Sequence, residues 1–300
     1  MEPKGKSKYV GNIQWVDGRI LINSGASRRG AHRLDKFRFC PQLFSYEDVL
    51  GITIPEDKTA LVNGSGTHIG AAHHYVRRGA AQPGGVVYMG QTFTDPDAFH
   101  EPIPAMRLAA GLTTGVERTL WEKLGPNMVA MLEHYVIWCH GQDLGYRVVA
   151  VEQEVEVMVE GNLYTQRIDL ALEDRRGQVC IFDHKTSGRP DKAETYYEDD
   201  WQIAGLYRFG RGIYKDKFDS VRLNIIGSVA PFVCRRVTAA FRPVFARRLE
   251  RRVLDVETEI KRLLDSGRDP WDWPIREICR NRFGHRCKAW RLCHEAGRRP

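Results

Sequence analysis

Several segments that would assign a chain to a familiar class are missing from this sequence of 300 residues. No uninterrupted apolar run reaches the ~20 residues that a bilayer-spanning helix requires, so we expect no membrane partner. No apolar segment follows the charged N-terminus, which predicts no secretory signal and leaves a cytoplasmic location as the default expectation. Repeats and low-complexity segments are absent too, and with 42% hydrophobic and 28% charged residues we expect an ordinary globular protein.

Two common catalytic signatures and a disulfide framework are also missing. The sequence has no Gly-x4-Gly-Lys-Ser/Thr loop, so it encodes no ATP-driven motor. It has no Gly-x-Ser-x-Gly motif of the serine-hydrolase type either. Its cysteines are odd in number, and seven cysteines without a secretory signal argue against paired disulfides. Three of them have apolar neighbours and are expected in the core, namely Cys139, Cys180 and Cys234.

Charge is present in excess of one sign, but only in part of the chain. Residues 231–300 carry 18 Lys and Arg against 9 Asp and Glu, whereas residues 1–230 carry 27 against 29. A basic C-terminal third on a near-neutral body predicts a polyanionic partner, with nucleic acid first among the possibilities. The alternative is a solvated basic helix surface, and charge alone does not decide between them.

The spacing of apolar residues predicts both helices and strands. Helices are expected near 34–44, 127–140, 199–207 and 242–266, with Pro41 at a break or in the first turn of a second helix; strands are expected over 147–152, 155–159, 163–172, 181–187 and 223–229. A glycine-rich turn over 64–68 is expected to open a packed helix. Residues 1–23 are expected to be peripheral and residues 24–293 to form one domain, with a core over about 127–230 and a basic helix and cysteine region over about 240–293.

The most informative stretch surrounds Asp169 and Asp183. The charged, Gly-containing segment 173–178 lies between two β-prone runs and predicts a hairpin that sets the two acids on neighbouring strands. Two close carboxylates in an apolar sheet repel each other unless a cation lies between them or one stays protonated. Lys185 shares a strand face with Asp183 because side chains alternate with period two. The pattern therefore indicates a site for a hard metal, Mg²⁺ or Mn²⁺.

Two alternatives bear on this site. The simpler interpretation of Asp183 and Lys185 is a surface ion pair on a hairpin. Upstream, His68 and His73 lie on or after the glycine-rich turn, and a single histidine is more often structural than a ligand. Because they are five residues apart and share a helix face poorly, we expect one ligand at most, and the spacing from Gly64 favours His68.

The order of these motifs resembles that of the PD-(D/E)XK nuclease superfamily, and within it the RecB-like branch. The matching segments, in chain order, are 64–68, 167–169, 183–186 and 202–207. The resemblance implies an α/β fold with a mixed central sheet flanked by helices, of restriction-endonuclease type. It also implies a metal-dependent nuclease. The second metal position here holds Asp183 where Glu is commoner in the superfamily.

Specific roles follow from this resemblance alone. It implies metal ligands at His68, Asp169, Asp183 and the backbone carbonyl of His184. It implies that Lys185 orients or activates the attacking water, and that Gln202 and Tyr207 support the site and contact DNA. Glu152 is a further candidate, as a ligand or as a carboxylate behind the ligands.

Three cysteines close together near the C-terminus suggest a second metal site. Cys279, Cys287 and Cys293 lie in a basic and aromatic segment, so they are unlike core filler. A zinc site would need a fourth ligand from His285, His294 or Cys40, whereas four thiolates also suit a [4Fe–4S] cluster. Cys40, followed by Pro41, resembles the first cysteine of the iron–sulfur nucleases of this branch, which include AddB and phage and CRISPR-associated exonucleases. The resemblance implies an iron–sulfur cluster that joins the N- and C-terminal helical parts.

The sequence thus predicts a Mg²⁺- or Mn²⁺-dependent deoxyribonuclease. By resemblance, we expect an exonuclease acting on DNA that is single-stranded or has free ends, in recombination, repair or phage DNA processing. A helicase, integrase or recombinase could work beside it. The rival hypotheses are a catalytically silent DNA-binding or assembly module of the same fold, and a zinc-stabilised RNA-processing protein. Exonuclease or endonuclease action, polarity, DNA or RNA preference and oligomeric state stay open.

Overall fold

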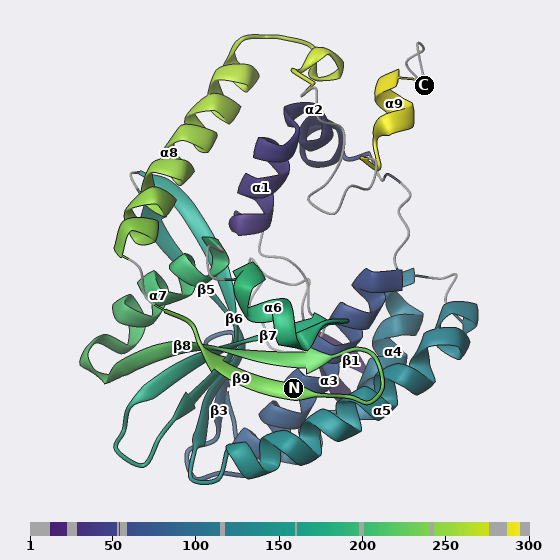
Figure 1. Ribbon diagram of the computed structural model, residues 1–300, viewed down its shortest axis with the longest axis vertical. Coiled ribbons are helices and arrows are strands. Elements are labelled where there is room, and N and C mark those ends of the chain that lie inside the picture. The colour runs from purple at the N-terminus through teal and green to yellow at the C-terminus, as the bar shows by residue number, and fades with distance from the viewer. Residues whose placement is uncertain are drawn as a thin grey trace. The chain divides into compact units, whose positions relative to one another are not determined.

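The computed structural model describes residues 13–22, 29–52, 54, 59–114, 118–159, 161–197, 201–240, 243–275 and 287–294. These residues form two compact units (Figure 1). The first takes in residues 1–26, 59–155 and 167–242, and the second takes in residues 27–58, 156–166 and 243–300. Among the described helices, none is both long and apolar enough to cross a membrane.

A mixed sheet of seven strands runs in the order β4-β3-β5-β6-β7-β8-β9. Its strands are β3 (Val86–Tyr88), β4 (Gln91–Phe93), β5 (Arg147–Val159), β6 (Asn162–Glu173), β7 (Val179–Ser187), β8 (Phe218–Gly227) and β9 (Cys234–Thr238). β3 is parallel to β5 and β7 to β8, whereas β6–β7 and β8–β9 are antiparallel. A mixed sheet flanked by helices confirms the predicted α/β class and suits a restriction-endonuclease-like core. A separate hairpin joins β1 (Ile13–Val16) to β2 (Arg19–Ile22).

Helices cover both faces of β7, and its side chains alternate between them. The even-numbered residues, such as Phe182, join the core formed with α3 (Thr59–Ala80) and α5 (Arg118–Gln142). The odd-numbered Asp183 and Lys185 instead bond to α7 (Trp201–Tyr214). The remaining helical segments of this unit are α4 (Pro102–Thr114), α6 (Pro190–Tyr197), η2 (Pro96–Ala98) and η3 (Lys215–Lys217). The period of two in the strand therefore separates two chemically different environments.

The predicted glycine-rich turn over 64–68 is wrong, because these residues lie inside α3. The glycines allow close helix packing instead. A Cβ on Gly66 would come within 2.8 Å of Met128 Sδ, and one on Gly70 within 2.5 Å of Leu132 Cδ2. Those contacts belong to α5, so the glycines let α3 and α5 approach each other more closely than any side chain would permit.

The second unit pairs N-terminal with C-terminal helices. It contains α1 (Ala31–Phe39), α2 (Pro41–Phe44), η1 (Ser45–Val49), α8 (Pro243–Asp265), η4 (Pro270–Asp272) and α9 (Trp290–His294). Pro41 opens α2, as expected of a residue whose missing N–H is not needed in a first turn. Two ion pairs join α1 to α8, Arg33 to Glu257 and Asp35 to Arg252. An apolar stripe of α8 is buried from Leu249 through Leu263.

Candidate metal centre and catalytic residues

The β6–β7 hairpin is present where the sequence predicted it. Leu170 pairs with Phe182, and the turn closes with the Asp174 N–H donating to the Gln178 carbonyl at 2.8 Å. Asp169 and Asp183 are the next residues beyond the Leu170–Phe182 pair. At that point the strands separate, and the His184 N–H donates to Asp169 Oδ2 at 2.8 Å.

Three side chains from three elements converge beside this hairpin: His68 from α3, Glu152 from β5 and Asp169 from β6. One potential ligand atom from each lies within 4.8 Å of the others. His68 Nδ1 is 3.4 Å from Asp169 Oδ2 and 3.9 Å from Glu152 Oε1. Both carboxylates are buried, with 4% of Glu152 and 8% of Asp169 exposed. We call these three residues the acidic group.

The electrostatics of the acidic group favour a bound cation. Burial and the neighbouring charge of Asp169 raise the pKa of Glu152 well above its usual value. Burial also acts to raise the pKa of Asp169, but His68 and the His184 side chain outweigh it and hold that pKa below its usual range. Burial lowers the pKa of His68, which makes its proton easier to replace with a metal ion. Two carboxylates and a neutral imidazole match the donor set of a hard divalent cation.

Glu152 departs from regular strand geometry. Its φ of 46° lies in the left-handed region, although it stands within β5. A non-glycine residue rarely adopts this conformation, and such strain persists where the surrounding structure fixes it. Arg167 contacts it, with Nη1 3.5 Å from Glu152 Oε2. In the sequence, Glu152 showed only as an acid within a strand, so the signal for its place in this group was weak.

Asp183 and Lys185 form a second set of contacts, with α7. Lys185 Nζ lies 2.7 Å from Asp183 Oδ2, and Asp183 is only 1% exposed. Gln202 of α7 bridges the two: its Oε1 accepts from Lys185 Nζ at 2.7 Å, and its Nε2 donates to Asp183 Oδ1 at 2.8 Å. The group that places three ligand atoms within 4.8 Å of one another does not contain Asp183. Its role as a metal ligand stays a prediction.

The described contacts of Tyr207 and His73 lie within the fold, and the role of Tyr207 in supporting the site and contacting DNA stays a prediction. The Tyr207 hydroxyl donates to the Ala239 carbonyl, and its ring packs edge-on against Phe218. His73 accepts the Ile22 N–H at Nε2 and donates from Nδ1 to the His100 carbonyl, both at 3.0 Å. Both ring nitrogens of His73 are therefore occupied, whereas His68 faces the two acids. The structure thus favours His68 over His73 as the ligand.

The cysteines described in the second unit share one apolar cluster. Cys40 and Cys287 are 5% and 8% exposed, and Cys293 packs against the same group of residues. The Cys293 Sγ lies 3.9 Å from the Tyr46 hydroxyl. Cys279 and His285, also predicted as possible ligands, lie outside the described residues. The structure thus brings cysteines from opposite ends of the sequence into one buried environment.

The fold and these contacts define an α/β protein with a site suited to a divalent metal. A family model described as the PD-(D/E)XK nuclease superfamily matches residues 30–294. The chain belongs to this superfamily, whose members are in general nucleases and act on nucleic acid. No curated protein matches the chain. A solved structure titled "Crystal structure of SSO0001" is similar at 14% identity over 47% of this chain and 68% of that one, with a TM-score of 0.27, too low to support an argument.

Proposed function

We propose that this protein is a DNA nuclease dependent on Mg²⁺ or Mn²⁺. The observation that carries the proposal is the Asp183–Lys185–Gln202 set beside an acidic group of unbalanced charge. His68, Glu152 and Asp169 would hold the ion, with Asp183 and the His184 carbonyl as further ligands. A bound divalent ion lowers the pKa of a water molecule and withdraws charge from a phosphate oxygen.

The protein's own residues supply orientation and fixed charge. The Lys185 ammonium, held by both Asp183 and Gln202, places a positive charge where negative charge develops on the scissile phosphate. Gln202 fixes the geometry because its amide can accept from Lys185 and donate to Asp183 in one orientation only. Lys185 can also orient the attacking water. Burial of Asp183 limits competing solvent contacts.

Cleavage of labelled DNA tests this proposal. Cleavage should require Mg²⁺ or Mn²⁺, and Asp183→Asn or Lys185→Ala should lower its rate by ~10²–10³-fold, the usual effect of removing a transition-state contact. Lys217→Ala is the matched control, because this lysine is exposed on η3. Undiminished cleavage in both site variants would contradict the assignment. Metal-independent DNA binding without any cleavage would instead favour the silent binding module.

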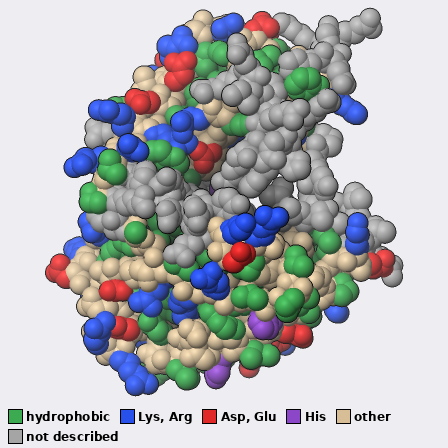
Figure 2. Space-filling model, viewed as in Figure 1, with side chains coloured by type: hydrophobic (Ala, Val, Ile, Leu, Met, Phe, Trp, Pro, Cys, Tyr) green, Lys and Arg blue, Asp and Glu red, His purple; other side chains and the backbone are tan. Residues whose placement is uncertain are grey.

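We further propose that the substrate is DNA with free ends, single-stranded by preference, and that the enzyme is an exonuclease. Family resemblance supports this, and so does the basic C-terminal third of the sequence. On α8, exposed basic residues include Arg247, Arg248 and Arg251, and Figure 2 shows basic side chains interspersed with acidic ones over the face in view. Degradation of linear strands but not of closed circles would support this proposal, and cleavage of both at equal rates would reject exonuclease action.

We also propose that Cys40, Cys279, Cys287 and Cys293 hold a [4Fe–4S] cluster. The shared apolar cluster of Cys40, Cys287 and Cys293 supports it, because thiolates in such a setting are metal ligands or inert core residues. Anaerobically purified protein should be brown, absorb near ~400 nm and contain iron. Cys287→Ser should abolish the absorbance, and Cys234→Ser, the control, should not. Zinc without iron would support the alternative structural zinc site.

A further inference from the structure

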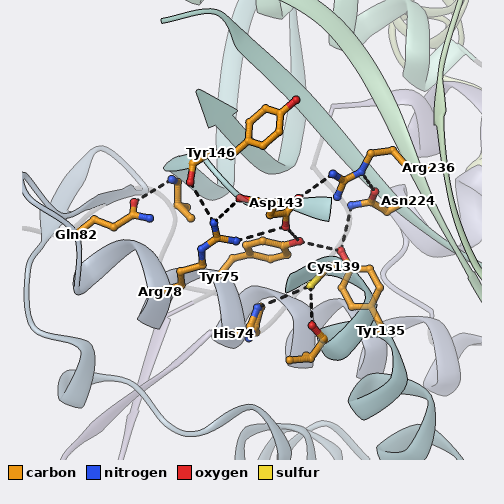
Figure 3. Close-up of polar contacts among 12 residues, drawn as sticks. His74, Tyr75, Arg78, Gln82, Tyr135, Cys139, Asp143, Tyr146, Asn224 and Arg236 are labelled. Carbon is orange, nitrogen blue, oxygen red and sulfur yellow. Dashed lines mark hydrogen bonds and ion pairs between the residues drawn. The ribbon is translucent and has the colours of Figure 1, made fainter. Parts of the chain in front are cut away.

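Figure 3 shows a buried ring of polar side chains. We call it the Asp143 ring; its members are Tyr75, Tyr135, Asp143, Asn224 and Arg236. One of its members, Asn224, pairs with His184 in the sheet, so it lies on the face opposite Asp183 and Lys185. Asp143, Asn224 and both tyrosines are 0% exposed. The five residues come from α3, from α5 and the turn after it, and from β8 and β9. Such a network is costly to bury unless its members satisfy one another.

The hydrogen bonds of this ring close on themselves. Arg236 donates from Nη1 to Asp143 Oδ1 at 2.7 Å and from Nε to Asn224 Oδ1 at 2.8 Å. Asn224 Nδ2 donates to the Tyr135 hydroxyl at 3.0 Å. Tyr75 lies 3.2 Å from the Tyr135 hydroxyl and donates to Asp143 Oδ2 at 2.6 Å. Each member therefore fixes the orientation of the next.

A count of protons gives the direction of the remaining bond. The single hydroxyl proton of Tyr75 is donated to Asp143, so Tyr75 can only accept from Tyr135. The Tyr135 proton then has two acceptors, Tyr75 at 3.2 Å and His184 Nε2 at 2.8 Å. The shorter contact favours His184. A donor at Nε2 places the proton of a neutral imidazole on Nδ1.

His184 connects this ring to the acidic group. Its ring is enclosed by Tyr135, Tyr75 and His68, with centroids 5.5, 6.0 and 6.0 Å away. Its Nδ1 faces Asp169 Oδ2 at 3.8 Å, and its backbone N–H donates to the same oxygen at 2.8 Å. Holding the His184 ring therefore also holds the peptide that orients the Asp169 carboxylate.

We propose that Tyr135 is a positioning residue of the metal centre, acting through His184. Its hydroxyl selects the Nδ1–H form of His184 and fixes the ring, and His184 in turn keeps Asp169 Oδ2 in one orientation. This inference rests on the proposed function only in naming Asp169 as a metal ligand. Tyr135 lies on α5, outside the nuclease motifs of the sequence.

Two measurements that need no turnover test the proposal. In full-length protein labelled with ¹⁵N-histidine and freed of divalent ions, the His184 ring should show the Nδ1–H tautomer by NMR, and Tyr135→Phe should abolish that preference. By calorimetry, Tyr135→Phe should weaken Mn²⁺ binding by about tenfold, the lower end of the effect of groups behind metal ligands. Tyr75→Phe is the matched control: it removes a hydroxyl from the same ring, so it should lower the melting temperature without changing either readout.

The outcomes separate positioning from general stability. Equal losses of Mn²⁺ affinity in Tyr135→Phe and Tyr75→Phe would overturn the proposal, as would an unchanged His184 tautomer in Tyr135→Phe. If Tyr135→Phe does not fold, His184→Phe tests the same link, because it keeps the peptide and removes both ring nitrogens; unchanged Mn²⁺ affinity would overturn the proposal. Where all variants fold, the double variant Tyr135→Phe/His184→Phe should bind Mn²⁺ no more weakly than His184→Phe alone, because Tyr135 acts through His184. Failure of DNA cleavage with these NMR results intact would count against the proposed function and not against Tyr135.

Discussion

Two buried polar clusters meet at His184, and they differ in how charge is matched. In the Asp143 ring, the one carboxylate is ion-paired with Arg236 at 2.7 Å, and the partly exposed Arg78 lies 3.5 Å from it at the edge of the ring. In the acidic group, the described contacts bring two carboxylates together with one guanidinium, that of Arg167, which lies 3.5 Å from Glu152. Charges buried for structure are paired and hydrogen-bonded, whereas an excess of one sign needs another partner.

This difference in charge matching gives the two clusters different roles, structural for the Asp143 ring and metal-binding for the acidic group. Arg78 also donates to the carbonyls of Asp143 and Tyr146, at 2.9 and 3.1 Å, just after the end of α5. The ring thus ties the end of α5 to the strands. In the acidic group, a divalent cation would relieve the repulsion between Glu152 and Asp169. The predictions below test whether each cluster responds as its charge balance requires.

The largest effect on stability should come from removing the carboxylate of the Asp143 ring. Asp143→Asn leaves Arg236 and Arg78 without their carboxylate in a buried site, which should lower the free energy of unfolding by about 3–5 kcal/mol. Urea unfolding measures this loss. Asp97→Asn is the control, since that side chain is 85% exposed and 3.8 Å from Arg77. A loss no greater than in the control would show that the ring contributes little to stability.

The acidic group should instead gain stability when it binds a metal ion. Mn²⁺ at ~100 times its dissociation constant should stabilise the protein by about 2.7 kcal/mol. Glu152→Gln should remove most of this gain, yet it should not lower the stability of the metal-free protein, because it takes away one of two converging carboxylates. Thermal melts with and without Mn²⁺ give both values. Glu156→Gln, on the exposed side of the same strand, should keep the full gain; loss of it there would point to a non-specific effect.

Helix α3 contributes His68 to one cluster and Tyr75 to the other, so its distance from α5 should affect both. Gly70→Ala places a methyl group against Leu132 and Met106 and should cost about 1–3 kcal/mol. Gly141→Ala, within α5 and with open space around it, should instead gain about 0.5–1 kcal/mol from helix propensity. Circular dichroism during thermal unfolding compares them. Equal shifts in both variants would contradict the packing explanation of the glycines.

The contrast also shows what the sequence could reveal. The hairpin between Asp169 and Asp183, and the shared face of Asp183 and Lys185, were predictable because short-range alternation sets them. The segment 64–70 was misread because glycine usually marks turns, and only the side chains of α5 explain glycine within a helix. Features set by neighbouring residues in the sequence were predicted correctly, and features set by residues distant in the sequence were not.

The two clusters themselves were harder to predict. Glu152 was undervalued because its left-handed backbone is set by the surrounding sheet and not by its neighbours in sequence. Tyr135 lies within the helix predicted near 127–140, and its ring is buried in the apolar core. Its hydroxyl bond to His184 joins residues 49 positions apart, and no local pattern signals such a contact.

The smallest predicted effect is a loss of folding stability at low pH that is caused by His73 and not by the metal centre. Burial lowers the pKa of His73 to about 4. Folding thus favours the neutral form, so the stability it contributes is complete above pH ~6.5 and is lost as pH falls toward the lowered pKa. At pH ~5.5 the loss should be about 1 kcal/mol.

Urea unfolding between pH ~6.5 and ~5.5 measures this loss, and His140→Asn, which changes an exposed histidine, is the control. Burial also lowers the pKa of His74 to about 4, so part of the pH dependence of stability should persist in His73→Gln. If the pH dependence in His73→Gln is unchanged, His73 is not one of its causes.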